Sequence, residues 1–290
     1  MMSKTLLRGL ELIEIIGLHG PLTVTEIARH TGMELSLVSR TVTACERAGW
    51  LARAHGKILV GFRSALLGLT SPASDAIRRA GPLVHAIAGA TGISTIASAL
   101  VGREAMMIAA APVNGPASAF PAGVLSRVPV HLMADGRAIA AQLDDHVLSS
   151  VLPPEPYPTS EQLMTSGSVG PALQGFVASL PGPSAQAVPG PLTRADMDAQ
   201  IAQIRSEGFS RDTGQVHRGT YCIARPWPAA GIPSAIACVG GRDEILQRRV
   251  MVEACLAAST DPGATAQDVI RAAAGLGDDV VRAERAGSAS

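Results

Sequence analysis

The chain has 290 residues, enough for one large or two ordinary domains, and its 24 basic and 24 acidic residues give a formal net charge of zero. That balance excludes a uniformly basic nucleic-acid coat and an acidic solvating protein. Hydrophobic residues make up 47% of the chain and charged residues 17%, so we expect a sizeable core and exclude wholesale disorder.

The first 62 residues have the pattern of three helices followed by a β-hairpin. Apolar residues at helical spacing predict a first helix over 5–18 and a third over 34–48. Thr23 and Glu26 form a capping-box pattern that begins a short second helix. Two short strands flank a tight turn at His55-Gly56. This order is typical of a winged helix-turn-helix.

The rest of the chain is predicted as a linker helix over 63–80, a second domain over 81–260 and a C-terminal tail over 261–290, with room in the tail for one more Ala-rich helix before a frayed end. Helix-breaking pairs stand at Ser71-Pro72 and Gly81-Pro82. The expected strands cover 93–101, 104–111, 209–213, 220–225 and 234–239, and the expected helices cover 131–142, 144–151, 193–207 and 242–258. The Pro-, Gly- and Ser-rich segment 152–192 is expected to include a surface excursion. Mixed strands and helices predict an α+β protein whose second domain has helices packed on a sheet.

The N-terminus and the cysteines indicate a cytoplasmic protein. Glu11 and Glu14 and the lack of a small-residue cleavage site argue against a signal peptide, and no run reaches the ~20 apolar residues of a bilayer span. The cysteines form no CxxC pair and lie in apolar stretches, which indicates reduced thiols and no metal cluster. They are Cys45, Cys222, Cys238 and Cys255.

Three separated blocks of sequence resemble the IclR family of bacterial transcriptional regulators, over about residues 4–258. The first begins TLLRGLELIEII and continues through the helix-turn-helix region. The second, VPVHLMADGRAIAA at 128–141, is similar to the family's P-x-H-x-T-A-x-G-K-A block. The third, at 206–227, is similar to a run that ends G-x-x-C-[IV]-A-x-P. The resemblance implies a winged helix-turn-helix, a linker helix, and an α/β effector-binding domain with a GAF-like sheet.

The third helix carries the candidate DNA-reading residues. Short polar side chains and an arginine lie opposite the apolar stripe of this helix, as a recognition helix in the major groove requires; they are Ser36, Ser39, Arg40 and Thr43. A solvated helix face is the alternative interpretation of the same pattern. Arg8, Arg53 and Lys57 are expected to contact the DNA backbone, which positions the protein without specifying a sequence.

Charge is divided unevenly along the chain. Residues 1–70 hold eight basic and five acidic residues, a net charge of +3, and the remainder has a net charge of −3. A mildly basic small module beside a mildly acidic large one suits a nucleic-acid binder with a separate sensing domain. With so little charge on each copy, we expect affinity for double-stranded operator DNA to come from a homodimer or tetramer.

The resemblance also implies a site for a small organic effector in the second domain. The matching positions are His131, Met133, Ala134, Asp135, Asp212, Cys222, Ala237 and Val239. Asp135 places a negative charge at the helix start, and Ala237 and Val239 offer no hydroxyls, so a small keto acid is disfavoured. A larger, aromatic or largely apolar ligand with a hydroxyl or amine donor fits better. Met106 and Met107 could line this site or belong to the ordinary core, and His131 could be a site residue or a structural imidazole.

We expect no enzymatic activity and no cofactor. Cys222 with His131 or His217 could form a nucleophile and base, but the sequence has no GxSxG, Walker, HExxH or GxGxxG motif. The expected function is ligand-responsive regulation, as a repressor or an activator, of a catabolic operon. The alternative is an effector-independent DNA-binding regulator whose pocket is vestigial or serves oligomerisation.

Overall fold

The computed structural model describes residues 4–113, 127–165, 190–215, 219–227, 229–261 and 263–287. The chain divides into two compact units, Met1–Ser74 and Asp75–Ser290. No helix in these ranges combines the length and the apolar character needed to cross a membrane.

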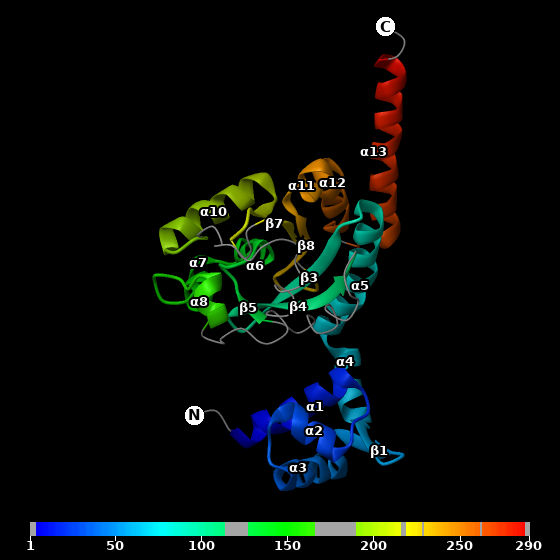
Figure 1. Cartoon of the computed structure of the whole chain (residues 1–290), viewed down its shortest axis with the longest axis vertical. Helices are drawn as coiled ribbons and strands as arrows, with labels where there is room; N and C mark the ends of the chain where they lie inside the picture. Colours follow the sequence, from blue (N-terminus) through cyan, green and yellow to red (C-terminus); the bar gives the residue numbers. More distant parts are fainter. Residues whose placement is uncertain are drawn as a thin grey trace. The chain divides into compact units, whose positions relative to one another are not determined.

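The first unit is a winged helix-turn-helix. Its elements are α1 (Lys4–His19), α2 (Val24–Thr31), α3 (Leu35–Arg47), β1 (Leu51–Ala54), β2 (Lys57–Val60) and α4 (Phe62–Thr70), as seen in Figure 1. Leu12, Ile27, Val38 and Val42 are completely buried in a core that all three leading helices share. The predicted capping box is present, since the Thr23 hydroxyl accepts from the Glu26 backbone N–H and the Glu26 carboxylate accepts from the Thr23 N–H. The predicted order of helices and hairpin is confirmed.

The second unit is a mixed α/β domain. Its strands are β3 (Ser94–Val101), β4 (Glu104–Ala111), β5 (Arg127–Pro129), β6 (Ser210–Asp212), β7 (Thr220–Pro226) and β8 (Ser234–Gly241). Its helices are α5 (Pro72–Thr91), α6 (Ala134–Ala140), α7 (Asp145–Val151), α8 (Ser160–Thr165), α10 (Arg194–Glu207), α11 (Arg242–Gln247), α12 (Arg249–Ser259) and α13 (Ala266–Gly287). The strands form one antiparallel sheet in the order β5-β4-β3-β8-β7-β6. The predicted α+β fold class is confirmed.

Helices cover the two faces of this sheet separately. Ala97, Ile223 and Cys238 share a core with residues of α5, α12 and α13. On the other face, Ile96, Cys222 and other side chains from the alternate strand positions pack against α6. Figure 1 shows α5 and α13 on one side of the sheet and α6 with α10 toward the other. Buried side chains on both faces explain why these strands are apolar along their whole length.

The linker region predicted over 63–80 contains two helices, α4 and α5, which separate at Ser71 as the Ser71-Pro72 pair predicts. Helix α5 then continues through Pro82 to Thr91 instead of breaking at Gly81-Pro82. Leu83, on the buried side of α5, is 1% exposed, so core packing holds the helix across the proline. Ala76 and Ala80 also belong to this core, which assigns most of α5 to the second unit.

Other elements differ from the prediction in length or number. The Ala-rich helix expected in the C-terminal segment is α13, and its Val269 is completely buried in the core of the second unit, so this part of the chain is not a separate tail. The expected helix over 242–258 divides into α11 and α12 at Arg248. Strand β5 and helix α8 were not predicted, and residues 166–189 of the Pro-rich segment lie outside the described ranges.

Candidate DNA-binding face and effector site

The candidate DNA-reading side chains lie on one exposed face of α3. Ser36, Ser39, Arg40 and Thr43 are all exposed, while Val38 and Val42 on the opposite side are completely buried. Arg40 Nε donates to the carbonyl of Ser36 at 3.4 Å, so its side chain follows the helix surface. The buried stripe fixes the orientation of α3, and this orientation presents short polar groups and one guanidinium to solvent.

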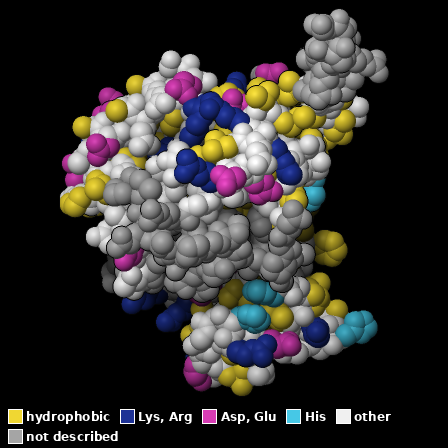
Figure 2. Space-filling view, turned by 45° about the horizontal axis from the view of Figure 1, so that its top comes forward, with side chains coloured by type: hydrophobic (Ala, Val, Ile, Leu, Met, Phe, Trp, Pro, Cys, Tyr) yellow, Lys and Arg dark blue, Asp and Glu magenta, His cyan; other side chains and the backbone are white. Residues whose placement is uncertain are grey.

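The three residues expected to contact the DNA backbone are also exposed. Arg8 lies on α1, Arg53 on β1 and Lys57 at the start of β2. Arg53 Nε and Nη2 donate to the two carboxylate oxygens of Glu46 at 3.0 and 3.1 Å, which ties the wing to α3. On the face shown in Figure 2, basic side chains form separate patches among acidic and apolar ones.

Helix α6 lies close against the chain that precedes it because residue 136 is glycine. A Cβ atom at Gly136 would lie 2.5 Å from the carbonyl oxygen of Val130 and 2.9 Å from its Cα, both backbone atoms. All seven residues of α6 are buried. The helix therefore brings Ala134, Asp135 and Arg137 directly onto the sheet.

Asp135 is a buried acid at the start of α6. The residue is 4% exposed, and Ser98 on β3 donates to its Oδ2 at 2.6 Å. Its Oδ1 is buried and has no hydrogen-bond partner among the described residues. Burial raises the pKa of Asp135, because removal from water disfavours the charged carboxylate.

Arg137 is a buried base that the sequence analysis did not select. It is 1% exposed, and Nη1 donates to the carbonyls of His131 and Leu132 at 3.1 and 3.0 Å. Nη2 donates to the carbonyl of Arg211 on β6 at 3.1 Å. Arg137 thus connects the chain before α6 to the edge of the sheet. Its place in the sequence block, where the family pattern has lysine, was a signal that could have identified it.

Asp212 and Cys222 are paired across β6 and β7. Asp212 Oδ1 accepts from the backbone N–H groups of Gly214 and Gln215 at 2.9 and 2.7 Å, which closes the turn after β6. Burial raises the pKa of Asp212, and the nearby Arg137 guanidinium acts in the opposite direction. Burial also raises the pKa of the Cys222 thiol well above its ordinary value.

The structure brings most of the predicted effector residues together. Met133, Ala134, Cys222, Ala237 and Val239 belong to one buried apolar cluster between α6 and the sheet, and each is at most 5% exposed. Met107 joins this cluster, whereas Met106 packs with the core on the other face. Asp135, Arg137 and Asp212 supply its charged groups. We name this set, with Ser98, the α6 cluster.

His131 has a different environment from the rest of the predicted site. Its Nε2 lies 2.9 Å from the carbonyl oxygen of Pro158, and its ring centroid is 5.2 Å from that of Tyr157. Burial lowers the pKa of His131. The imidazole is therefore a buried neutral group held by the segment before α8.

The residues considered for catalysis do not form an activated pair. The thiol of Cys222 has a raised pKa, whereas a nucleophilic cysteine needs a lowered one. The imidazole of His131 is bound to Pro158, and His217 lies outside the described residues.

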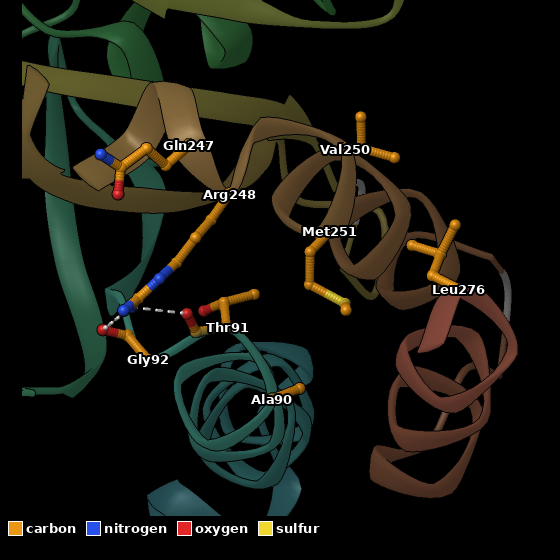
Figure 3. A pocket seen from close by; sticks show the side chains of 8 residues that line it. All are labelled: Ala90, Thr91, Gly92, Gln247, Arg248, Val250, Met251 and Leu276. Atoms are coloured by element: carbon orange, nitrogen blue, oxygen red, sulfur yellow. Dashed lines mark hydrogen bonds between the residues drawn. The ribbon is translucent and has the colours of Figure 1, made fainter. Parts of the chain in front are cut away.

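A cavity of about 670 Å³ lies in the helical layer of the second unit (Figure 3). It is lined by Ala90, Thr91, Gly92, Gln247, Arg248, Val250, Met251 and Leu276. Arg248 Nη1 donates across it to the carbonyls of Thr91 and Gly92 at 3.0 and 3.1 Å. The cavity contains none of the predicted effector residues.

Comparisons with known proteins agree with this architecture. Residues 10–57 match a sequence model of the MarR family. No curated protein sequence matches the chain. An IclR homologue from Microbacterium hydrocarbonoxydans, solved with 4-hydroxybenzoate, is 19% identical with a TM-score of 0.57, over 94% of this chain and 100% of that one.

Two further solved structures are similar to this chain over nearly their whole length. An IclR transcriptional regulator from Alicyclobacillus acidocaldarius is 15% identical with a TM-score of 0.55, over 94% of this chain and 100% of that one. The IclR protein of Thermotoga maritima is 16% identical with a TM-score of 0.52, over 92% and 97%. The chain therefore shares its two-part fold with solved IclR-type regulators.

Proposed function

We propose that this chain, which has the fold of IclR-type regulators, is a cytoplasmic transcriptional regulator that binds operator DNA with its first unit and a small organic effector with its second. The observation that carries the DNA-binding half is the exposed face of α3. Ser36, Ser39, Arg40 and Thr43 form this face in a winged helix-turn-helix, where a recognition helix presents its base-reading side chains.

Arg40→Ala tests this role. Selection from random duplexes supplies the operator, and mobility shifts then compare operator and random DNA. We expect a loss of about 1–3 kcal/mol on the operator and a smaller loss on random DNA, because only the operator offers the specific base contact. Arg78→Ala, an exposed arginine of the second unit, removes the same charge elsewhere and is the matched control. Equal losses on both duplexes, or none, would remove Arg40 from base reading.

The effector half of the proposal rests on the α6 cluster. Its walls are apolar, with Met133, Ala237 and Val239 in one buried group, and its polar groups are mainly acids. This composition favours an aromatic or largely apolar effector with a hydroxyl or amine group to meet Asp135 or Asp212. The bound 4-hydroxybenzoate of the Microbacterium hydrocarbonoxydans structure supports an aromatic effector in a protein of this fold.

We further propose that the effector changes the arrangement of the DNA-binding units of a homodimer or tetramer that controls a catabolic operon. A ligand can shift such an equilibrium only by binding one arrangement more tightly than the other. Effector binding is therefore expected to change operator affinity in gel shifts.

The near-complete burial of the α6 cluster favours one alternative, a regulator whose pocket is vestigial or serves oligomerisation. Thermal shifts with a panel of aromatic acids, phenols and amines separate the two. Stabilisation by any member supports an effector site, whereas no stabilisation at millimolar concentrations supports the alternative.

A further inference from the structure

The carboxylate of Asp135 has an unsatisfied oxygen within the α6 cluster. Ser98 donates to Oδ2, but the buried Oδ1 has no hydrogen-bond partner among the described residues. The bond to Ser98 on β3 shows that this carboxylate is directed from α6 toward the sheet, where the apolar cluster lies. A buried acceptor without a donor is costly, and a ligand that supplies the donor recovers that cost.

Arg137 does not neutralise Asp135. Its Nη1 and Nη2 groups donate to three backbone carbonyls, and Asp212 is the acid that favours its charged form most. Two acids therefore face one base in the buried site. Oδ1 of Asp212 also accepts hydrogen bonds from two backbone N–H groups in the turn after β6. Asp135 is also favoured in its ionised form by the Arg137 charge and by the backbone N–H groups at the start of α6, but burial outweighs them and raises its pKa.

We infer that the effector is an organic cation, a protonated amine on an apolar body, whose ammonium group binds Oδ1 of Asp135. This inference rests on the proposed function only in taking the α6 cluster as the effector site. The apolar body would contact Met133, Ala237 and Val239, which share the buried cluster with the start of α6.

Other ligand classes fit the site less well. A carboxylate would meet two acids and a single base, Arg137, whose Nη groups already donate to carbonyls and whose buried Nε is the one nitrogen left without a hydrogen-bond partner among the described residues. An alcohol could pair with Asp135 but brings no positive charge, so it would not stabilise the ionised carboxylate that burial disfavours. Within the described residues, no three His, Cys, Asp or Glu side chains form a group that could hold a metal ion. Of the carboxylate, alcohol and ammonium groups, the ammonium group supplies both the donor and the charge.

Proton linkage follows from the same geometry. The titratable or hydrogen-bonding groups that act on Asp135 are Ser98 on β3, Arg137 on α6, Asp212 on β6 and Cys222 on β7, while β8 contributes the apolar Ala235, Ala237 and Val239 to the cluster. In the free site, burial favours the protonated acid. Binding of an ammonium ion then leaves the carboxylate ionised and releases that proton to solvent. Affinity for the amine should therefore rise with pH until Asp135 is ionised in the free protein.

The test compares matched amines, alcohols and acids on the full chain. Benzylamine, 2-phenylethylamine and butylamine are each titrated by calorimetry beside the alcohol and the acid of the same skeleton, at pH 6 and pH 8. We expect at least one amine to bind tenfold or more tightly than its alcohol, more tightly at pH 8 than at pH 6, and the acids not to bind. A preferred acid, an alcohol equal to its amine, or no binding by any amine would overturn the inference.

Variants locate the charge that recognises the ligand. Asp135→Asn should reduce amine affinity to that of the alcohol and abolish the dependence on pH. Glu161→Gln, an exposed acid on α8, should change neither and is the matched control. An Asp135→Asn protein that keeps the amine preference would contradict the assignment. The ligand ranking in the unaltered chain decides the question even if this variant does not fold.

Operator binding distinguishes this inference from the proposed function. A chain that binds operator DNA but prefers acids retains the proposed function and loses the inference. A chain that binds amines but no DNA retains the inference about the ligand and loses the proposed role in DNA binding.

Discussion

The buried acid at position 135 makes stability depend on pH in a defined direction. Burial raises the folded-state pKa of Asp135 above its unfolded value of about 3.9. An acid whose pKa is raised by folding costs no stability at pH values below its unfolded-state pKa. The cost grows as pH rises above that pKa and is complete once pH has passed the folded-state pKa. Asp135→Asn should therefore raise the free energy of unfolding at pH 7 by about 1.4 kcal/mol for each pKa unit removed.

Denaturant unfolding of both proteins between pH 4.5 and pH 8 measures this effect. The advantage of the asparagine variant should shrink toward the acid end of this range. An advantage that is constant with pH would show that the ionisation of Asp135 is not its cause.

The close approach of α6 to Val130 makes Gly136 sensitive to substitution. Gly136→Ala places a Cβ 2.5 Å from a backbone oxygen, so α6 must move, at a cost of about 1–3 kcal/mol in unfolding free energy. Gly89→Ala on α5, where a Cβ meets nothing within 4 Å, is the matched control and should stabilise by about 0.5–1 kcal/mol. Equal effects in thermal unfolding would contradict the close packing of α6.

Most residues of the candidate site were predictable because they lie in short sequence blocks that resemble a known family. Asp135, Asp212 and Cys222 do lie within one buried site, and Ser36, Ser39, Arg40 and Thr43 do share one face. Arg137 was not selected because an arginine is normally exposed, and its burial depends on packing against the sheet and on a carbonyl of the distant Arg211 as well as on the nearby carbonyls of His131 and Leu132. Their roles in binding stay predictions.

Among the elements, the last helix is an integral part of the second unit. Val269 on α13 is completely buried against the core, while its neighbour Ile270 is 49% exposed. Val269→Ala should lower the unfolding free energy by about 2 kcal/mol, from the two lost methyl groups and the cavity that they leave. Ile270→Ala should have a smaller effect in the same denaturant titration. The opposite order would show that α13 does not pack as described.

The elements that periodicity predicted well are those with one buried face or clear end signals. The strands over 94–101 and 104–111 differ from the prediction by one residue or none. Strand β5 was not predicted because it has only three residues, and α5 was divided in the prediction because Pro82 ordinarily interrupts a helix. In both cases the deciding contacts come from distant residues, which local sequence does not report.

For the whole molecule, the separation of charge predicts the strength and the salt dependence of DNA binding. Residues 1–70 carry a net charge of +3, so each copy should neutralise ~3 phosphates and give a slope near −3 in log affinity against log salt concentration. Lys57→Gln should reduce the slope by about 1 for each bound copy. Fluorescence anisotropy on random duplexes from 50 to 200 mM salt measures it. A slope near zero would contradict phosphate contact by the first unit.

Both edges of the sheet in the second unit resist extension by another chain. The edge strands β5 and β6 each have three residues, β5 ends at Pro129, and the Arg211 carbonyl on β6 is occupied by Arg137. Short edges, prolines and occupied carbonyls are features that prevent edge-to-edge pairing. Copies of this protein are therefore expected to associate through helical surfaces, and Arg137, whose guanidinium occupies a carbonyl of the edge strand β6, is expected to help disfavour strand-by-strand aggregation of the folded protein.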